Sequence, residues 1–282
     1  MNDIVKNKLI NGKYFLKSFL KIKPKIFLAG LQKCGTTSLY NYLIQHDSIL
    51  HGDIKKNNIL SKKNSNLQEY LSYFPYYKKN KKAICGSHQL TYFPFGLKRI
   101  KYHFPEAKIL LIVRNPIDRA YSAYQHGCRH SKDSKFSFEE WVDVELEILN
   151  NLKDISNINE IFESTKWRGY PENSWDINER YSAGMYLSRG IYANYINEIK
   201  NLSLSFHITS LEELSENPKL TLNKIFDFLQ LKNSNKIDFK VFNSGSYERE
   251  IDSSTIEKLN KFYSPHNNKF FQLISKKFNW NQ

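Results

Sequence analysis

Residues 26–39 read IFLAGLQKCGTTSL: an apolar run, a short loop bounded by Gly30 and Gly35, and the start of an amphipathic helix. In a turn of this kind the backbone N–H groups converge on one point, and the helix N-terminus adds partial positive charge. The stretch therefore predicts a strand, a helix and, between them, a binding site for a phosphate or a sulfate.

The spacing within this loop resembles that of loops that hold nucleotide phosphates. Four residues separate Gly30 from Gly35, and two hydroxyl residues follow. In an ATP-binding loop a lysine comes directly after the second glycine. Thr36 stands there instead, and the basic residue is Lys33, inside the loop. This displacement indicates a ligand other than an ordinary Mg²⁺-nucleotide.

The composition favours one large α/β domain with an anionic partner. Of the 282 residues 40% are hydrophobic, with 19 Phe and 18 Tyr, which is enough to fill a sizeable core. The net charge of +14 favours a nucleotide, a nucleic acid, an acidic glycan or a membrane surface as partner. Three separated cysteines indicate neither a disulfide framework nor a zinc site, so we expect a reducing compartment.

The first 24 residues are a basic segment that also carries large apolar side chains. This segment can lie on an anionic membrane as a peripheral contact, or it can be a basic surface helix of its own domain. We expect the surface helix. The sequence contains neither a run of about 18–20 apolar residues nor a signal-peptide core, so we expect a cytoplasmic protein. Residues 25–282 then form a single domain, with a polar excursion at about 151–182.

The remaining patterns predict a parallel sheet. Apolar runs at 25–29, 108–113 and 205–209 indicate strands, and each is followed by a helical pattern. A strand, a crossover helix and a second strand make a parallel sheet flanked by helices, with ligands outside the carboxyl ends of the strands. A capping box at Ser137–Glu140 predicts a helix to about Asn150, and Asn217-Pro218 predicts the start of another.

A second anion site is predicted where the strand at 108–113 ends in Arg114. A Mg²⁺-dependent NTPase has an aspartate at such a position, whereas a guanidinium offers a planar, permanently charged fork to a phosphate. Ser122, in the following helix, can join Arg114 on one anion. Arg114 can instead cap a helix or pair with Asp118. Together with the glycine loop, it favours a metal-independent protein that holds a nucleotide with two separate anionic groups.

The two motifs together resemble those of the sulfotransferases that use 3′-phosphoadenosine 5′-phosphosulfate (PAPS). The stretch 33–39 is similar to their 5′-phosphosulfate loop, and the stretch 114–124 is similar to their 3′-phosphate motif. Weaker segments at 184–193, 211–218 and 262–267 follow the order seen in carbohydrate sulfotransferases. The resemblance covers roughly residues 24–280.

This resemblance implies a P-loop NTPase-like three-layer fold and in-line transfer of a sulfuryl group from PAPS to an acceptor hydroxyl, without a metal. The product would be 3′-phosphoadenosine 5′-phosphate (PAP). Lys33 would neutralise charge on the leaving phosphate and the bridging oxygen, as Mg²⁺ does in kinases. Arg114 and Ser122 would hold the 3′-phosphate. The 5′-phosphosulfate would be held by the loop and the helix start: Cys34, Gly35, Thr36, Thr37 and Ser38.

Three further residues receive roles from the same resemblance. Arg119 is expected to be structural, as an ion-pair partner on its helix. Ser246 and Tyr247 lie where the family has a loop that closes over the donor, so they are expected to contact it.

The acceptor hydroxyl needs a base near the strand that follows the first crossover. Many carbohydrate members carry a glutamate there, where this sequence has Ser87. The cytosolic small-molecule sulfotransferases use a histidine in a comparable segment, and imidazole can take a hydroxyl proton near neutral pH. We therefore predict His88 as the catalytic base.

The expected function is sulfation of a hydroxyl on a saccharide or a glycolipid. The order of the segments after Gly184 favours a carbohydrate acceptor, whereas His88 favours a small molecule; lipids and peptide tyrosines are further alternatives. Thr36 and Arg114 argue against a P-loop kinase. The charge of +14 also suggests a nucleic-acid-binding protein. No RNP, zinc-finger or helix-turn-helix signature supports that function, so no specific nucleic acid is expected.

Overall fold

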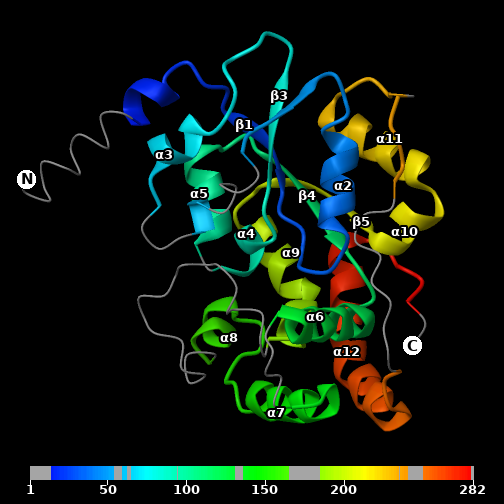
Figure 1. Cartoon of the computed structure of the whole chain (residues 1–282). Helices are drawn as coiled ribbons and strands as arrows, with labels where there is room; N and C mark the ends of the chain where they lie inside the picture. Colours follow the sequence, from blue (N-terminus) through cyan, green and yellow to red (C-terminus); the bar gives the residue numbers. More distant parts are fainter. Residues whose placement is uncertain are drawn as a thin grey trace, which may run out of the picture.

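A parallel sheet of five strands in the order β2-β3-β1-β4-β5 forms the centre of the fold (Figure 1). The computed structural model describes residues 14–53, 59–61, 65–93, 95–130, 136–164, 185–234, 236–240 and 250–280. The strands are β1 (Pro24–Leu28), β2 (Ile49–His51), β3 (Lys82–Gly86), β4 (Lys108–Val113) and β5 (Ser205–Ser210). All four strand pairings are parallel.

Three of these strands, β1, β4 and β5, confirm the prediction from apolar runs. The apolar runs did not indicate β2 and β3, because β2 has three residues and β3 is a short run that begins with a lysine. Residues 109–113 of β4 are all buried, although successive side chains of a strand point to opposite faces of the sheet. Both faces are therefore covered, and the predicted arrangement of a parallel sheet flanked by helices is confirmed.

The helices that flank the sheet fall into groups that pack on each other. Helix α2 follows β1 and lies beside α11 (Figure 1), and the ring of His46, just after the end of α2, is 4.8 Å from that of Phe226 in α11. Helix α12 packs on α9, with 5.5 Å between the rings of Tyr192 and Phe270. The helices are α2 (Thr36–Leu43), α3 (Leu67–Ser72), α4 (Gln89–Tyr92), α5 (Gly96–His103), α6 (Pro116–His130), α7 (Phe138–Asn150), α8 (Ile158–Ser164), α9 (Tyr192–Asn201), α10 (Leu211–Glu216), α11 (Pro218–Leu229) and α12 (Ser253–Ile274).

Both predicted helix starts are confirmed. Ser137 and Glu140 form a reciprocal capping box at the start of α7. The side chain of Asn217 accepts a hydrogen bond from the Leu220 N–H, and Pro218 is the first residue of α11. The polar excursion at 151–182 includes the short helix α8, and residues 165–184 lie outside the described part of the chain.

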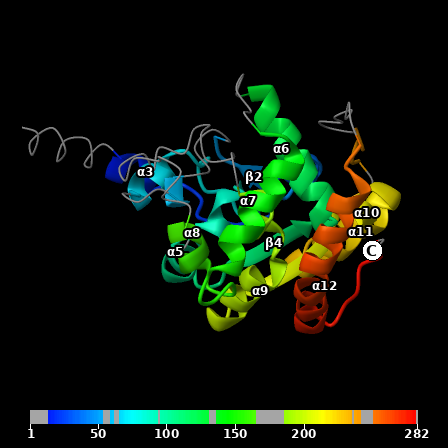
Figure 2. The same ribbon diagram turned by 90° about the horizontal axis from the view of Figure 1, so that it is seen from below.

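A second core lies beside the one that encloses the sheet. It joins α6, α7 and α12, which Figure 2 shows next to one another. Its centre includes Ala120 of α6, Phe138 of α7 and Tyr263 of α12, all buried.

The chain also forms two short 3₁₀ turns, η2 (Ile59–Ser61) and η4 (Ser188–Gly190). Within the described ranges, every helix is too short or too polar to cross a bilayer.

Candidate functional site

The glycine loop and Arg114 lie at the same edge of the sheet. Strands β1 and β4 are parallel neighbours, with Leu28 paired to Leu110. The Ala29 N–H extends this pairing by donating to the Leu110 carbonyl at 3.0 Å. The loop follows β1 and Arg114 follows β4, so the carboxyl ends of neighbouring strands bring the two predicted anion motifs together.

The glycine loop is a tight turn that contains two residues with left-handed backbone angles. Lys33 and Gly35 both have left-handed φ angles, 68° and 87°. A Cβ on Gly35 would lie 2.6 Å from Cδ1 of Leu211, and a Cβ on Gly30 would lie 2.8 Å from Cγ2 of Ile112. The loop therefore wraps tightly over the ends of β4 and β5. Glycine is needed at both positions because the loop backbone packs directly against these side chains.

The first turn of α2 consists of Thr36, Thr37 and Ser38, three of the predicted donor-binding residues. Gly35 is the N-cap, no side chain caps the helix, and no acidic residue lies in the first turn. Since the first N–H groups of a helix have no partners within the helix, this end can accept an anion.

Cys34 differs from its neighbours because its side chain is completely buried. Burial raises the pKa of its thiol to about 12, although the charges of Arg119 and Arg114 oppose this rise. The thiol therefore belongs to the core beneath the loop, and Cys34 can serve a ligand only through its backbone.

Arg114 is partly buried, directly after β4, and its carbonyl accepts a 2.7 Å hydrogen bond from the Tyr192 hydroxyl. Two carboxylates lie near it. Glu212 accepts the Asn115 N–H at 2.9 Å, and the charge of Arg114 opposes the rise that burial causes in the pKa of Asp118. Arg114 therefore interacts electrostatically with Asp118, which was the predicted alternative to anion binding.

Ser122 lies in the second turn of α6, as predicted, but its side chain is only 3% exposed. Its hydroxyl is therefore enclosed by the protein. Ser246 and Tyr247, the predicted contacts from a closing loop, lie outside the described residues.

His88 follows β3, at the same edge of the sheet as the two anion motifs. Burial and the positive charges of Arg189 and His126 lower its pKa to about 4. The imidazole is therefore neutral at neutral pH, which is the form that can accept a proton. Its backbone carbonyl accepts a 3.0 Å hydrogen bond from the Thr91 hydroxyl.

Sequence reasoning missed Arg189, which connects the loop to His88. Arg189 is in η4 and is 1% exposed, and its guanidinium donates to the Gln32 side chain, next to Lys33. It is also one of the two charges that lower the His88 pKa. In the sequence, Arg189 stands before Gly190 in the segment 184–193. That segment supported the resemblance only through its place in the order of segments along the chain.

Two buried charges hold the segment that carries Arg189. Glu145 of α7 accepts the backbone N–H groups of Tyr186 (2.6 Å), Leu187 (2.9 Å) and Ser188 (3.0 Å), and also the Ser188 hydroxyl (2.9 Å). Arg119 of α6 is fully buried and donates to the Tyr186 carbonyl. Arg119 was expected to be an ion-pair partner on its helix. In the structure its guanidinium donates a hydrogen bond to a backbone carbonyl of another segment.

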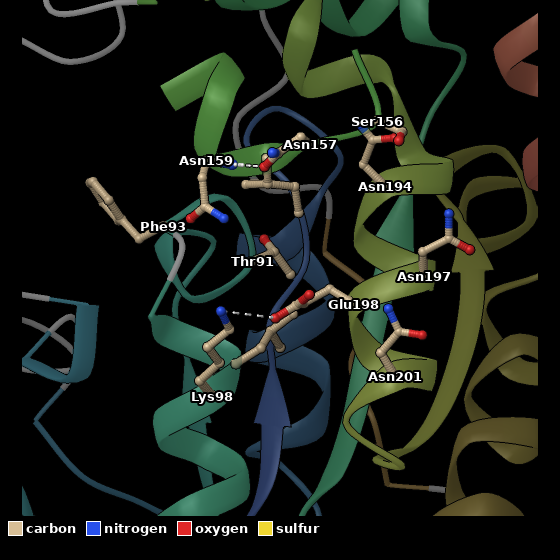
Figure 3. Close-up of a pocket in the computed structure, with 12 residues that line it drawn as sticks. Thr91, Phe93, Lys98, Ser156, Asn157, Asn159, Asn194, Asn197, Glu198 and Asn201 are labelled. Carbon is tan, nitrogen blue, oxygen red and sulfur yellow. Dashed lines mark hydrogen bonds and ion pairs between the residues drawn. The ribbon is translucent and has the colours of Figure 1, made fainter. Parts of the chain in front are cut away.

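A separate polar cavity of about 260 Å³ lies between α4, α5, α8 and α9 (Figure 3). Lys98 and Glu198 point toward each other across it, with 4.0 Å between Nζ and Oε1. Thr91, whose hydroxyl contacts the His88 carbonyl, also lines the cavity. Side chains with carboxamide groups make up much of the rest: Asn157, Asn159, Asn194, Asn197 and Asn201. Of the predicted site residues that the structure describes, none lines the cavity.

Comparison with known proteins identifies the family. Residues 23–278 match the sulfotransferase domain, so the chain belongs to the sulfotransferase family. Carbohydrate sulfotransferase 15 of Mus musculus is 25% identical over 326 residues, covering 94% of this chain and 55% of the relative. The bifunctional heparan sulfate N-deacetylase/N-sulfotransferase 1 of Xenopus laevis is 30% identical over 150 residues, covering 48% of this chain. That match spans 16% of the relative's length.

The fold agrees with that assignment. A solved sulfotransferase from Alicyclobacillus acidocaldarius superposes with a TM-score of 0.68 and 22% identity, covering 91% of this chain and 97% of the other. The predicted P-loop-like α/β fold and the predicted family are thus confirmed.

Proposed function

We propose that this sulfotransferase transfers the sulfuryl group of PAPS to a hydroxyl of a saccharide or glycolipid acceptor. One observation carries the proposal: the glycine loop after β1 and Arg114 after β4 lie at one edge of the sheet, on neighbouring strands. A donor with phosphates at both its 5′ and 3′ positions requires two such anion sites.

The loop and the start of α2 would hold the 5′ end of the donor. Gly30 and Gly35 let the loop pack closely over the ends of β4 and β5, and the N–H groups of Thr36 to Ser38 supply donors. Lys33 would neutralise charge on the leaving phosphate, so we assign this task to the lysine and not to a metal ion. Arg114 would bind the 3′-phosphate as a charged fork.

His88 would take the proton from the acceptor hydroxyl. Its pKa of about 4 keeps the imidazole neutral at neutral pH. Burial is the main cause of this lowered pKa, and the charge of Arg189, which is held by Glu145 and Arg119, adds to it. The same guanidinium donates to Gln32 in the loop, so the base and the donor site share one buried support.

Two observations support a saccharide as acceptor. Two relatives are named for heparan sulfate and for carbohydrate. The polar cavity is lined by Thr91, whose hydroxyl bonds to the His88 carbonyl, and by carboxamide groups that can hydrogen-bond to sugar hydroxyls. His88 itself favours the alternative, a small-molecule acceptor, and a transfer assay with both classes distinguishes them.

Calorimetric titration of the protein with PAP and, separately, with ADP tests the donor assignment. We expect PAP to bind more tightly, because only PAP carries a 3′-phosphate. Arg114→Ala should remove this preference, whereas Arg129→Ala, an exposed arginine on α6, should keep it. Equal affinity of the wild-type protein for both nucleotides would overturn the proposal.

A further inference from the structure

Six large apolar side chains gather on one part of the surface. Among the described residues eleven such side chains are exposed, and these six are 57–78% exposed: Phe15, Leu16, Phe19, Leu20, Tyr76 and Tyr77. They belong to two segments that lie side by side. The Tyr77 N–H donates to the Leu20 carbonyl at 2.9 Å, and the Ile22 N–H donates to the Pro75 carbonyl at 2.9 Å.

Exposed lysines surround these side chains, and acidic residues are missing from both segments. Neither residues 4–46 nor residues 70–105 contain an aspartate or a glutamate. A hollow between the segments is lined by Phe19, Leu20 and Tyr77 together with lysines. Five lysines of the two segments are exposed: Lys17, Lys23, Lys25, Lys78 and Lys79. We call the six apolar residues and these five lysines the N-terminal surface.

We infer that the N-terminal surface binds an anionic lipid bilayer peripherally, in place of the plain surface helix that was expected from the sequence. Large exposed apolar patches on a protein mark interaction sites. Apolar side chains can enter the headgroup region while lysines contact anionic lipids, and tyrosine suits this boundary because its ring is apolar and its hydroxyl polar. A second copy of the chain is a poorer partner for the same surface, because face-to-face pairing would bring like charges together.

The position of this surface separates it from the candidate active site. Residues 22–23 directly precede β1, and residues 76–81 directly precede β3, so the surface lies at the amino ends of these strands. The glycine loop and Arg114 lie at the carboxyl ends. Figure 1 shows the first described residues (dark blue) at the upper end of the sheet and α6 below its lower end. A protein bound in this way directs its site away from the bilayer.

Vesicle sedimentation with the full chain tests this inference. The protein should sediment with vesicles of phosphatidylcholine and phosphatidylserine, less so as salt is added, and not with phosphatidylcholine alone. Phe19→Ala/Leu20→Ala should weaken binding at least about tenfold, as should replacement of Lys23, Lys25, Lys78 and Lys79 by glutamine.

Two matched controls should bind like the wild-type protein: Leu220→Ala, an exposed leucine on α11, and glutamine at four exposed lysines elsewhere, Lys219, Lys232, Lys236 and Lys261. Equal binding to neutral vesicles, or unchanged binding of the Phe19→Ala/Leu20→Ala variant, would overturn the inference. So would a dimer in sedimentation velocity that this variant converts to a monomer. Unchanged PAP affinity in the variant shows that the surface acts independently of the active site.

Discussion

The hydroxyl of Tyr192 donates a 2.7 Å hydrogen bond to the backbone carbonyl of Arg114. The same hydroxyl lies 3.9 Å from the thiol of Cys34, in the glycine loop. One side chain at the start of α9 therefore contacts both predicted anion motifs, at residues that are 78 and 158 positions away in the sequence. This contact fixes the position of one motif relative to the other.

Tyr192→Phe should weaken PAP binding several-fold, because it removes the hydrogen bond that holds the Arg114 backbone. The loss of unfolding free energy should be about 1 kcal/mol. Tyr42→Phe is a matched control, since the Tyr42 hydroxyl donates a similar 2.8 Å bond to the Lys240 carbonyl, away from the site. It should cost similar stability and leave PAP affinity unchanged. If both variants keep wild-type affinity in calorimetry, Tyr192 does not position the site.

Gly35→Ala should abolish PAP binding. The φ of 87° at Gly35 costs an L-residue about 1–2 kcal/mol, and the new Cβ would meet Leu211 at 2.6 Å. The start of α2 must then move. Gly127→Ala, at a helical glycine of α6 without a positive φ, should retain binding. Retention of full affinity by Gly35→Ala would show that the loop backbone does not contact the donor.

His88→Ala should lower turnover by at least about a hundredfold and leave PAP affinity intact. Because the pKa of His88 is about 4, the wild-type rate should stay level as the pH falls through 6.5 and decline only near pH 4, where the base becomes protonated. Single-turnover rates measured across this pH range check the prediction. His103→Ala, on α5, is the control. A fully active His88→Ala enzyme would exclude this base.

Arg189→Gln should raise the pKa of His88 toward its ordinary value of 6.5, because one of the two lowering charges is removed. The acid limb of the rate profile should therefore shift to higher pH. A structural role alone would lower the rate at every pH without moving this limb. The lowered pKa of His88 also makes the stability of the fold depend on pH. Below pH 6.5 the unfolded chain binds a proton at His88 that the folded protein does not bind, so the free energy of unfolding decreases as the pH falls from 6.5 toward 4.

Glu145→Ala should reduce the free energy of unfolding by about 3 kcal/mol or more, since it leaves three buried N–H groups and the Ser188 hydroxyl without their acceptor. Denaturant unfolding measures this loss. Glu147→Ala, an exposed position on the same helix, should change stability little. Similar midpoints for the two variants would mean that Glu145 does not hold the 186–188 segment.

Local patterns were sufficient to predict β1, β4, β5 and the starts of α7 and α11. Apolar runs and capping residues act over a few positions, so they can be read one after another along the chain. Strands β2 and β3 were not predicted from such patterns, because their short runs become strands only by pairing in the sheet. The acceptor, the compartment and the role of each site residue stay predictions.

The glycine loop and Arg114 were recognisable from the residues alone, because a phosphate-binding turn needs its glycines and hydroxyls at fixed spacing. The support beneath them was not recognisable. Tyr192, Arg189 and Glu145 reach the site from segments far away in the sequence, and each matters through a buried hydrogen bond or charge. Such interactions gain their strength from exclusion of water, which happens only once the distant segments have packed together.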